Sequence, residues 1–479
     1  MQDNVTAYRE VQCMSKLQRG LLTLAIGLGL WFFPCPEGLD PKAWQLFAIF
    51  FTTIAGFIIQ PLPIGAIALM AVTFSMISGV LKPAEALSGY SNTTIWLIVS
   101  AFLFATGFIK TGLGRRIAYA LIRRFGESSL KLSYVFAVCE LIFAPATPSN
   151  TARAGGILYP IVSSLSEAYG STAENNPRRI GSYLFLTEYQ LNCISSAMFM
   201  TAMTGNPIIA GMASEALGVE ITWGLWALAG LVPGIISMIV IPYFLFKVYP
   251  PEVIHTPEAK ELAREELNKI GPLSAAEKML GGIFILALTL WATASYTGQN
   301  ATAIALLGVC LMLVCNIVNW RDVIENKSAW DTLVWMGTLI SLASGLVKLK
   351  FIAWFSTTVG AALVGIPGFY AFILIVLIYT YSHYGFASMV AHIVALYTAL
   401  ATLAVNAGVP PYVAALSLAF LSSICGSLTH YAAGPAPIYF GAGFVEQKTW
   451  WRLGFFISII NLFIWVGIGS AWWKVLGLW

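Results

Sequence analysis

The sequence predicts an all-α polytopic membrane protein, and three observations support that fold class. Hydrophobic residues make up 58% of the 479 residues, the mean hydropathy is +0.78, and charged residues make up only 10%. A soluble domain carries about 25% charged residues, so these charges are too few to cover a water-soluble body. Apolar runs of about 20 residues, enough to span a bilayer as a helix, recur along the chain. These features exclude a soluble globular protein, a disordered chain and a nucleic-acid-binding protein.

The apolar runs give a first count of the membrane crossings. Eleven runs are long enough, near residues 18–34, 43–60, 64–80, 93–110, 183–209, 224–247, 277–296, 300–318, 331–349, 412–441 and 452–473. Two further apolar stretches, near 133–168 and 367–405, are interrupted by polar residues. Irregular backbone at membrane depth is stable only where it is buried in protein or lines a wet cavity. We therefore predict about eleven transmembrane helices plus two re-entrant hairpins, the first with its tip at Ser149-Asn150-Thr151.

The basic residues predict the orientation. With the N-terminus cytoplasmic and both hairpins returning to the side they enter, twenty Lys and Arg lie inside and five outside. This is a strong positive-inside bias, so the N-terminus is predicted to be cytoplasmic and the C-terminus external. The first residues contain Asp3 and Glu10 and lack a signal-type apolar region. A bacterial cytoplasmic (inner) membrane therefore fits better than the alternative, an organellar inner membrane.

An internal repeat organises the chain. Residues 93–113 align with 331–351 at an offset of 238, and Thr222-Trp223 matches Thr449-Trp450 at an offset of 227. Because each half carries an odd number of crossings plus one hairpin, the second copy is inverted. We expect an N-terminal segment with the first helix (1–42), a first repeat (43–247), a cytoplasmic connector (248–276) and a second repeat (277–479). Inverted repeats with broken helices indicate a secondary transporter, with the site at the repeat interface.

Four polar clusters that break apolar runs mark the candidate substrate site. They lie at 149–151 and 204–207 in the first half, and at 388–392 and 428–437 in the second. Breaks in membrane helices expose N–H groups that bind anions, and hydroxyl and amide groups add donors for a carboxylate. The alternative is that these small residues merely allow close helix packing. The candidate substrate-binding residues are Ser149, Asn150, Thr151, Arg153, Asn206, Pro207, Ser388, His392, Thr429, Gly434 and Pro435.

Two basic residues stand beside the hairpin tips. Arg153 lies four residues after Ser149, and His392 lies four residues after Ser388, so each shares a helix face with its tip. Charge at membrane depth is costly and marks function by default, so both are predicted to act on the substrate or to replace an ion. The alternatives are an ion pair between Arg153 and Glu140, and a structural role for His392 in the core.

Other polar or reactive residues are expected to play lesser parts. His383 and His430 are predicted to be structural, and Glu188 is either a proton or ion group or a residue near the cytoplasmic edge. The seven scattered cysteines form no metal or disulfide pattern and are expected to be buried small hydrophobic residues.

No enzymatic motif competes with transport. The G-x-S-x-G, H-E-x-x-H, Walker and dinucleotide fingerprints are absent from the sequence, and no ligand set has metal spacing. We therefore expect no enzyme, no cofactor and no metal. A membrane-embedded hydrolase using Ser149 or Ser388 with His392 is the remote alternative.

Several longer motifs carry a family resemblance. They are TGLGRRIA at Thr111–Ala118, APATPSNTARAGG at Ala144–Gly156, RRIGSYL at Arg178–Leu184, HYGFAS at His383–Ser388, HIVALY at His392–Tyr397, AAGPAPIYFGAG at Ala432–Gly443 and WWRLG at Trp450–Gly454. Nearly end to end, the chain resembles the divalent anion/sodium symporter family. It is most similar to the exchanger branch, with its bacterial citrate/succinate and tartrate/succinate antiporters and the plastid 2-oxoglutarate/malate translocator.

The resemblance implies a homodimer whose protomers each have a scaffold domain and a transport domain that moves as an elevator. Two Ser-Asn-Thr motifs would hold the substrate carboxylates, and the first matches at Ser149-Asn150-Thr151. The second departs from the family, since Ser388 is followed by Met389. Arg153 and His392 would then stand where Na⁺ neutralises the substrate in symporters.

A fixed positive charge cannot dissociate, which favours obligatory exchange over return of an empty transporter. We therefore expect sodium-independent exchange of di- or tricarboxylates (a C4-dicarboxylate, 2-oxoglutarate, citrate or tartrate). The main alternative is a sodium-coupled dicarboxylate symporter. The expected partners are small carboxylate anions, the lipid bilayer and a second copy of the chain, with no nucleic acid.

Overall fold

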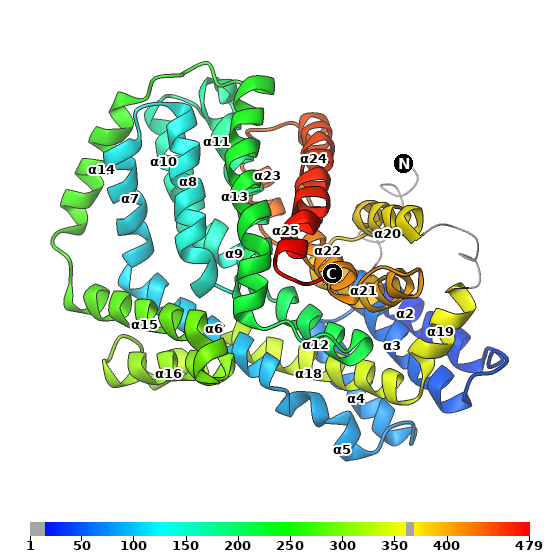
Figure 1. Cartoon of the computed structure of the whole chain (residues 1–479). Helices are drawn as coiled ribbons and strands as arrows, with labels where there is room; N and C mark the ends of the chain where they lie inside the picture. Colours follow the sequence, from blue (N-terminus) through cyan, green and yellow to red (C-terminus); the bar gives the residue numbers. More distant parts are fainter. Residues whose placement is uncertain (1–14, 361–367) are drawn as a thin grey trace. The chain divides into compact units, whose positions relative to one another are not determined.

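The computed structural model describes residues 15–360 and 368–479, and helices make up most of both ranges (Figure 1). No β-strand forms within these ranges, so the predicted all-α fold class is confirmed. The first fourteen residues of the predicted segment 1–42, and residue 367 at the start of the predicted second hairpin, lie outside the described residues.

Eight helices of the described chain are long and apolar enough to cross a membrane, or nine if one bent pair forms a single span. The bent pair is Ile95–Thr111 with Leu113–Phe125, at an angle of 61°. The two helices meet at Gly112, whose φ of 73° lies in the left-handed region that glycine adopts without strain. The chain is therefore a polytopic membrane protein, as predicted.

The predicted crossings 183–209 and 412–441 are interrupted helices. The first consists of α11 (Gly181–Met198) and α12 (Gly205–Leu217), separated by an extended residue, Phe199, and a short turn. The second begins with α22 (Pro411–Ile424) and ends in α23 (Ala436–Gly441) after an irregular stretch. Both breaks fall at the polar clusters identified in the sequence.

The helices form two compact units, each built from three separate stretches of chain. The first unit comprises 1–99, 207–220 and 327–418. Besides parts of α6 (Thr93–Thr111), α12 and α22, its helices are α2 (Lys16–Phe32), α3 (Pro41–Ile59), α4 (Ile64–Ile77), α5 (Pro83–Ala86), α18 (Lys327–Lys348), α19 (Phe351–Gly360), α20 (Gly368–Ser382) and α21 (Met389–Asn406).

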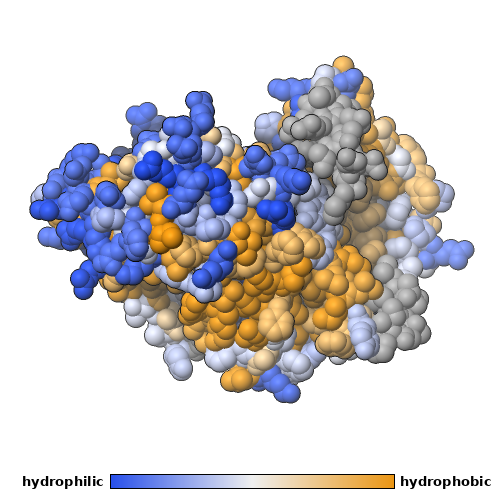
Figure 2. Space-filling view, turned by 90° about the horizontal axis from the view of Figure 1, so that it is seen from above, coloured by the Kyte–Doolittle hydropathy of each residue, from blue (hydrophilic) through white to orange (hydrophobic). Residues whose placement is uncertain are grey.

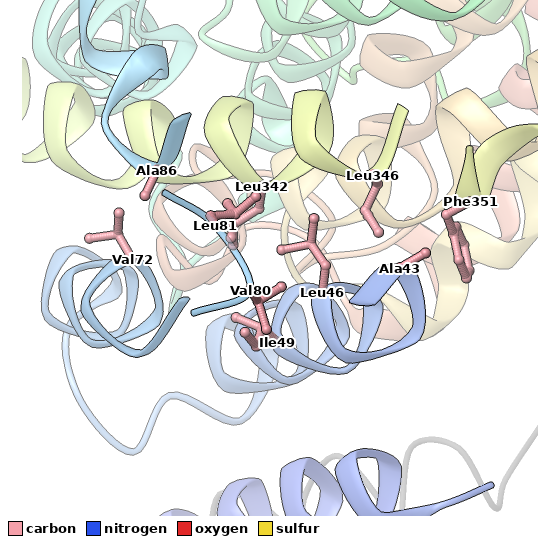
Figure 3. Packing of buried hydrophobic residues seen from close by; sticks show 10 residues of the cluster. All are labelled: Ala43, Leu46, Ile49, Val72, Val80, Leu81, Ala86, Leu342, Leu346 and Phe351. Carbon is pink, nitrogen blue, oxygen red and sulfur yellow. The ribbon is translucent and has the colours of Figure 1, made fainter. Parts of the chain in front are cut away.

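The first unit has a continuous apolar core. Leu46 of α3, Leu342 and Leu346 of α18 and Phe351 of α19 pack together in it (Figure 3). The ring of Phe47 stacks on that of Phe351, with centroids 4.6 Å apart. Helices distant in sequence are thereby held together by aliphatic and aromatic packing.

The second unit comprises 100–206, 221–326 and 419–479. Besides the remaining parts of α6 (Thr93–Thr111), α12 and α22, its helices are α7 (Leu113–Phe125), α8 (Ser129–Phe143), α9 (Asn150–Arg153), α10 (Tyr159–Ala168), α11, α13 (Trp223–Val248), α14 (Pro257–Ile270), α15 (Ala275–Thr297), α16 (Ala301–Val314), α17 (Trp320–Ile324), α23, α24 (Gln447–Leu462) and α25 (Gly469–Val475). Each unit thus draws on both predicted repeats, and the repeat boundaries themselves stay a prediction.

The surface of the second unit is divided by polarity. Hydrophilic side chains gather at the left of Figure 2, the side on which Figure 1 shows α7 and α14. Elsewhere large apolar side chains stand exposed, such as Ile239 of α13 and Ile285 of α15. Apolar surface of this extent is stable when lipid covers it.

Helix α11 is the centre of the second unit. Every residue from Gly181 to Met198 is buried, and the helix packs against α8, α10 and α13. The helix nevertheless carries Asn192, Ser195 and Ser196 on one face, because residues three and four apart lie together on a helix. These polar groups need partners inside the unit, and the first hairpin supplies them.

Candidate functional site

The predicted tip of the first hairpin is a helix N-terminus. Helix α8 ends at Phe143, a short turn follows, and Ser149 caps the next helical run. The Ser149 hydroxyl accepts a hydrogen bond from the Ala152 amide at 3.1 Å. Helix α9, the π-helical turn Ala154–Leu158 and α10 then continue without interruption. The positive end of the dipole of this helical run therefore lies at Ser149, and this favours the binding of an anion there.

The tip keeps polar groups available for a ligand. Asn150 Oδ1 accepts from the Thr151 amide at 3.0 Å, while Asn150 Nδ2 is buried without a hydrogen-bond partner among the described residues. Ser149 and Thr151 are half-buried. A buried amide donor without an acceptor is costly unless a ligand or water completes it. Two hydroxyls and one amide thus form a cluster suited to a carboxylate.

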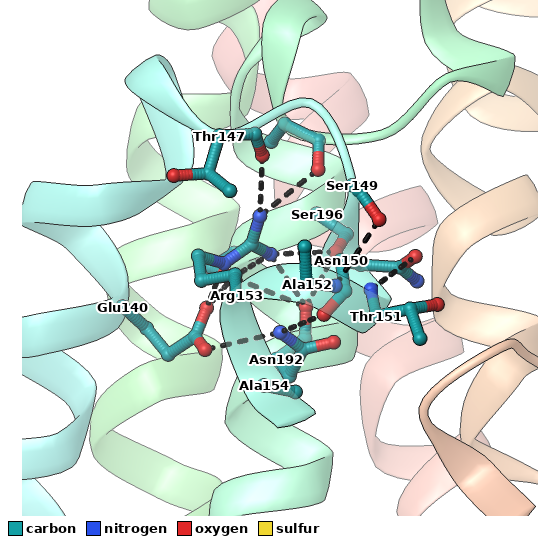
Figure 4. A network of polar contacts seen from close by, with 12 residues as sticks. Glu140, Thr147, Ser149, Asn150, Thr151, Ala152, Arg153, Ala154, Asn192 and Ser196 are labelled. Carbon is teal, nitrogen blue, oxygen red and sulfur yellow. Dashed lines mark hydrogen bonds and ion pairs between the residues drawn. The ribbon is translucent and has the colours of Figure 1, made fainter. Parts of the chain in front are cut away.

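Arg153 lies behind the tip and is completely buried (Figure 4). Its Nε donates to Glu140 at 2.6 Å, and its Nη1 donates to the carbonyls of Thr147 and Ala202, each at 3.0 Å. Its Nη2 donates to the hydroxyls of two α11 serines at 2.9 Å. All of its donor groups therefore have partners in the chain. The ion pair with Glu140, which the sequence offered as the alternative, is therefore present, and a substrate role for Arg153 stays a prediction.

The Glu140 carboxylate is held as firmly as the guanidinium. Asn192 Nδ2 donates to its Oε1 at 3.0 Å, and the Ser195 hydroxyl donates to its Oε2. Asn192, Ser195 and Ser196 belong to this network but are not among the residues predicted from the sequence. Their helical spacing on one face of an otherwise apolar segment is the signal that could have found them.

Asn206 closes the second predicted break. Its Nδ2 donates to the carbonyls of Ser196 at 2.7 Å and Phe199 at 2.9 Å, and its Oδ1 accepts from the Ser423 hydroxyl at 3.3 Å. The buried amide thus satisfies carbonyls at the end of α11 that the break leaves open. Asn206 therefore shapes the break, with its amide already engaged. Pro207, in the first turn of α12, is buried and adds no polar side-chain group.

The two breaks of the first half lie side by side. The Thr201 hydroxyl donates to the carbonyl of Pro145 at 2.7 Å, and the Thr204 hydroxyl donates to the carbonyl of Pro148 at 3.4 Å. Prolines lack a backbone N–H, so they interrupt the helix and leave neighbouring carbonyls to side-chain donors. The sequence predicted both breaks, and the structure joins them.

A segment from the second half reaches the same tip. A Cβ on Gly434 would collide with Oγ1 of Thr151, so the backbone at Gly434 lies directly against that hydroxyl. Pro435 follows as the N-cap residue of α23. Thr429 is buried, and its hydroxyl has no hydrogen-bond partner in the part of the chain that the structure describes. The structure thus brings Gly434 and Thr151 together.

The structure also shows the contacts of His430 and the burial of Glu188. His430 accepts a hydrogen bond at Nδ1 from the indole of Trp451 at 3.0 Å, an arrangement typical of a structural histidine. Glu188 is completely buried, near Glu140, Arg153 and Tyr439. Neither of its carboxyl oxygens has hydrogen-bond geometry with a residue in the described ranges.

The second hairpin repeats the design of the first inside the first unit. Ser388 caps α21 and accepts from the Ala391 amide at 3.3 Å. His392 is buried one turn later, with its Nε2 2.9 Å from the Tyr379 carbonyl and 3.0 Å from the Ser382 hydroxyl. A serine-capped helix followed by a buried basic side chain at the fourth position occurs in both hairpins.

No group of three or more His, Cys, Asp or Glu residues within the described ranges is arranged to hold a metal ion. The candidate site is built instead from hydroxyls, amides and helix N-termini, which are donors toward an anion.

The family model described as the sodium:sulfate symporter transmembrane region matches residues 14–479. The chain belongs to this family. The predicted membership of the divalent anion/sodium symporters is therefore confirmed, and the chain is a multi-pass membrane transporter rather than an enzyme.

Relatives match this transporter over nearly its full length. The YflS protein of Bacillus subtilis is 48% identical and covers 98% of both chains. Dicarboxylate transporter 1 of Arabidopsis thaliana chloroplasts is 47% identical, over 96% of this chain and 83% of that protein. The inner membrane protein YbhI of Escherichia coli is 41% identical, over 96% and 98%. The Alcanivorax borkumensis YdaH transporter shares the fold with a TM-score of 0.58 at 12% identity, over 91% of this chain and 98% of that chain.

Proposed function

We propose that this transporter exchanges dicarboxylates across the bacterial cytoplasmic membrane. The observation that carries the proposal is the capped helix N-terminus at Ser149, with the unpartnered amide of Asn150 beside it. The names of relatives give the substrate class, since YflS is named for malate and the chloroplast proteins for dicarboxylates. YbhI, named as an inner membrane protein, supports the location.

Binding uses donors that lie at the helix ends. One carboxylate accepts hydrogen bonds from the Asn150 amide and the hydroxyls of Ser149 and Thr151, with the dipole of the helix adding attraction. Ser388 and the first turn of α21 offer a carboxylate position of the same kind. Gly434, Pro435 and Thr429 shape the wall of the first position, while Arg153 and Asn206 hold its backbone.

The charge beside the proposed carboxylate position at Ser149 decides whether a side chain can replace Na⁺ there. Because Glu140 neutralises Arg153, this arginine does not offer a free positive charge in place of Na⁺. The imidazole of His392 is the other group proposed for that role. We retain sodium-independent exchange by an elevator movement in a homodimer, with the N-terminus cytoplasmic and the C-terminus external, as the proposed mode. Sodium-coupled symport is the competing one.

Counterflow in proteoliposomes tests the mode directly. Vesicles loaded with unlabelled malate should take up labelled malate equally well in Na⁺ and in K⁺, and empty vesicles should take up little. Uptake into empty vesicles that requires Na⁺ would establish symport instead. Competition by citrate, succinate, tartrate, malate and 2-oxoglutarate then ranks the substrates.

The Asn150→Asp variant tests the proposed contact. It replaces a donor amide by a carboxylate of nearly the same shape, so the substrate meets repulsion where it had a hydrogen bond. We expect at least a tenfold rise in the KM for malate, with Asn175→Asp in an exposed loop as the control. An unchanged KM would remove Asn150 from the binding site.

A further inference from the structure

We propose that the first unit binds one phospholipid with a primary ammonium headgroup, whose acyl chain enters an apolar pocket and whose ammonium meets Glu215. The pocket has a volume of ≈ 110 Å³ and lies among α3, α12, α18, α19 and α21. Nothing in the proposed exchange reaction uses it, because its walls carry almost no donors for a carboxylate.

The walls of the pocket continue the core of the unit. Leu346 and Phe351, which line it, belong to the buried cluster of Figure 3, and Phe47 and Phe355 pack against that cluster. An apolar cavity of about 150 Å³ stays dry and accepts a molecule the size of benzene. This pocket therefore has room for a short length of hydrocarbon, and water gains little there.

The location indicates a lipid as the source of the hydrocarbon. Helices α3, α18 and α21 each have the length and hydropathy of a membrane span. Lining residues such as Phe50 and Val347 are only half-buried, so the pocket is open rather than sealed. An opening between membrane-spanning helices gives access to acyl chains at high local concentration.

The polar end of the pocket selects the headgroup. Glu215, near the end of α12, lines the pocket and accepts a hydrogen bond from the Ser344 hydroxyl at 2.8 Å. Ser344 is part of α18. Lys348 lies one turn beyond Ser344 on this helix and pairs with Glu85. The carboxylate of Glu215, and an ammonium one turn beyond the serine that donates to it, match a zwitterionic headgroup, with the lipid ammonium at Glu215 and its phosphate toward Lys348. The predicted topology places this end in the outer leaflet.

Native mass spectrometry of the purified full chain tests the site. With phosphatidylethanolamine added, we expect one lipid per chain to survive delipidation. Phosphatidylcholine, whose quaternary ammonium has no N–H donor, should be retained at least fivefold less. Equal retention of the two lipids, or none of either, would overturn the proposal.

Variants locate the lipid. Ala395→Phe fills the pocket, and we expect it to lower retention of phosphatidylethanolamine about tenfold. Leu400→Phe, at a half-buried position of the same helix outside the pocket, is the control. Glu215→Gln should abolish the preference over phosphatidylcholine, whereas Glu325→Gln, an exposed residue of the second unit, should leave it unchanged. If Ala395→Phe retained as much lipid as Leu400→Phe, or if Glu215→Gln kept the same headgroup preference as Glu325→Gln, this pocket would be excluded as the lipid site.

Two further results would assign the pocket to another occupant. An Ala395→Cys variant that cross-links to a second copy of the chain would mean that a protomer covers the pocket, and this would overturn the proposal. Displacement of the lipid by malate would assign the pocket to the substrate and would overturn it as well. Lipid retention is measured without transport, so its failure and a failure of the proposed exchange are distinguishable.

Discussion

The Nε of Arg153 donates a hydrogen bond to Oε2 of Glu140 at 2.6 Å, and both side chains are completely buried. The two residues join α9, at the hairpin tip, to α8. The same guanidinium also binds the carbonyls of Thr147 and Ala202, which belong to the two breaks of the first half. One ion pair therefore holds the backbone on which the proposed carboxylate donors stand.

Removing one partner of this pair should destabilise the protein. An uncompensated buried charge costs about 3–5 kcal/mol, so Arg153→Met and Glu140→Gln should each lower the thermal unfolding temperature of the detergent-solubilised transporter. The double variant Arg153→Met/Glu140→Leu should recover part of that loss. If Arg153→Met kept full stability and lost only substrate binding, Arg153 would be a ligand to the substrate.

Glu188 should tolerate neutralisation far better than Glu140. Glu140 accepts hydrogen bonds from Arg153, Asn192 and Ser195, so loss of its charge leaves the guanidinium unpaired. Glu188 has no comparable set of donors among the described residues. We expect Glu188→Gln to keep near wild-type unfolding temperature and malate exchange. Equal losses in both variants would show that Glu188 shares the charge of Arg153.

The sequence alone predicted the membrane fold, both hairpin breaks and the serine at each tip. These features are local, since apolar run length, proline and capping residues act within a few positions. The sequence left Arg153 between two roles, because its partners Asn192 and Ser196 lie about forty residues away. The approach of Gly434 to Thr151 is likewise a tertiary contact that no local pattern announces. How the chain divides into two interleaved units is tertiary for the same reason.

Outside the membrane, Glu127 should make stability depend on pH. The ammonium groups of Lys131, at 2.5 Å, and of Lys260 hold the pKa of Glu127 at about 2. An unfolded glutamate has a pKa of about 4.3, so the stabilisation is complete above that pH and is lost as the pH falls toward 2. Hydrogen exchange in α14, compared between wild type and Glu127→Gln, should differ slightly at pH 6 and converge only as the pH falls to about 2. A difference independent of pH would contradict the ion pairs.

Gly434 should be essential for substrate binding because it has no Cβ. Any Cβ at this position would displace the Thr151 hydroxyl, one of the proposed donors at the tip. We therefore expect Gly434→Ala to raise the KM for malate at least tenfold while the unfolding temperature changes little, since position 434 is exposed and the substitution removes no packed atom. Gly441→Ala, at the end of α23 with no atom near its added Cβ, is the matched control and should behave as wild type. A Gly434→Ala variant with an unchanged KM would remove Thr151 and Gly434 from the binding site, whereas a fall in stability alone would make their contact structural.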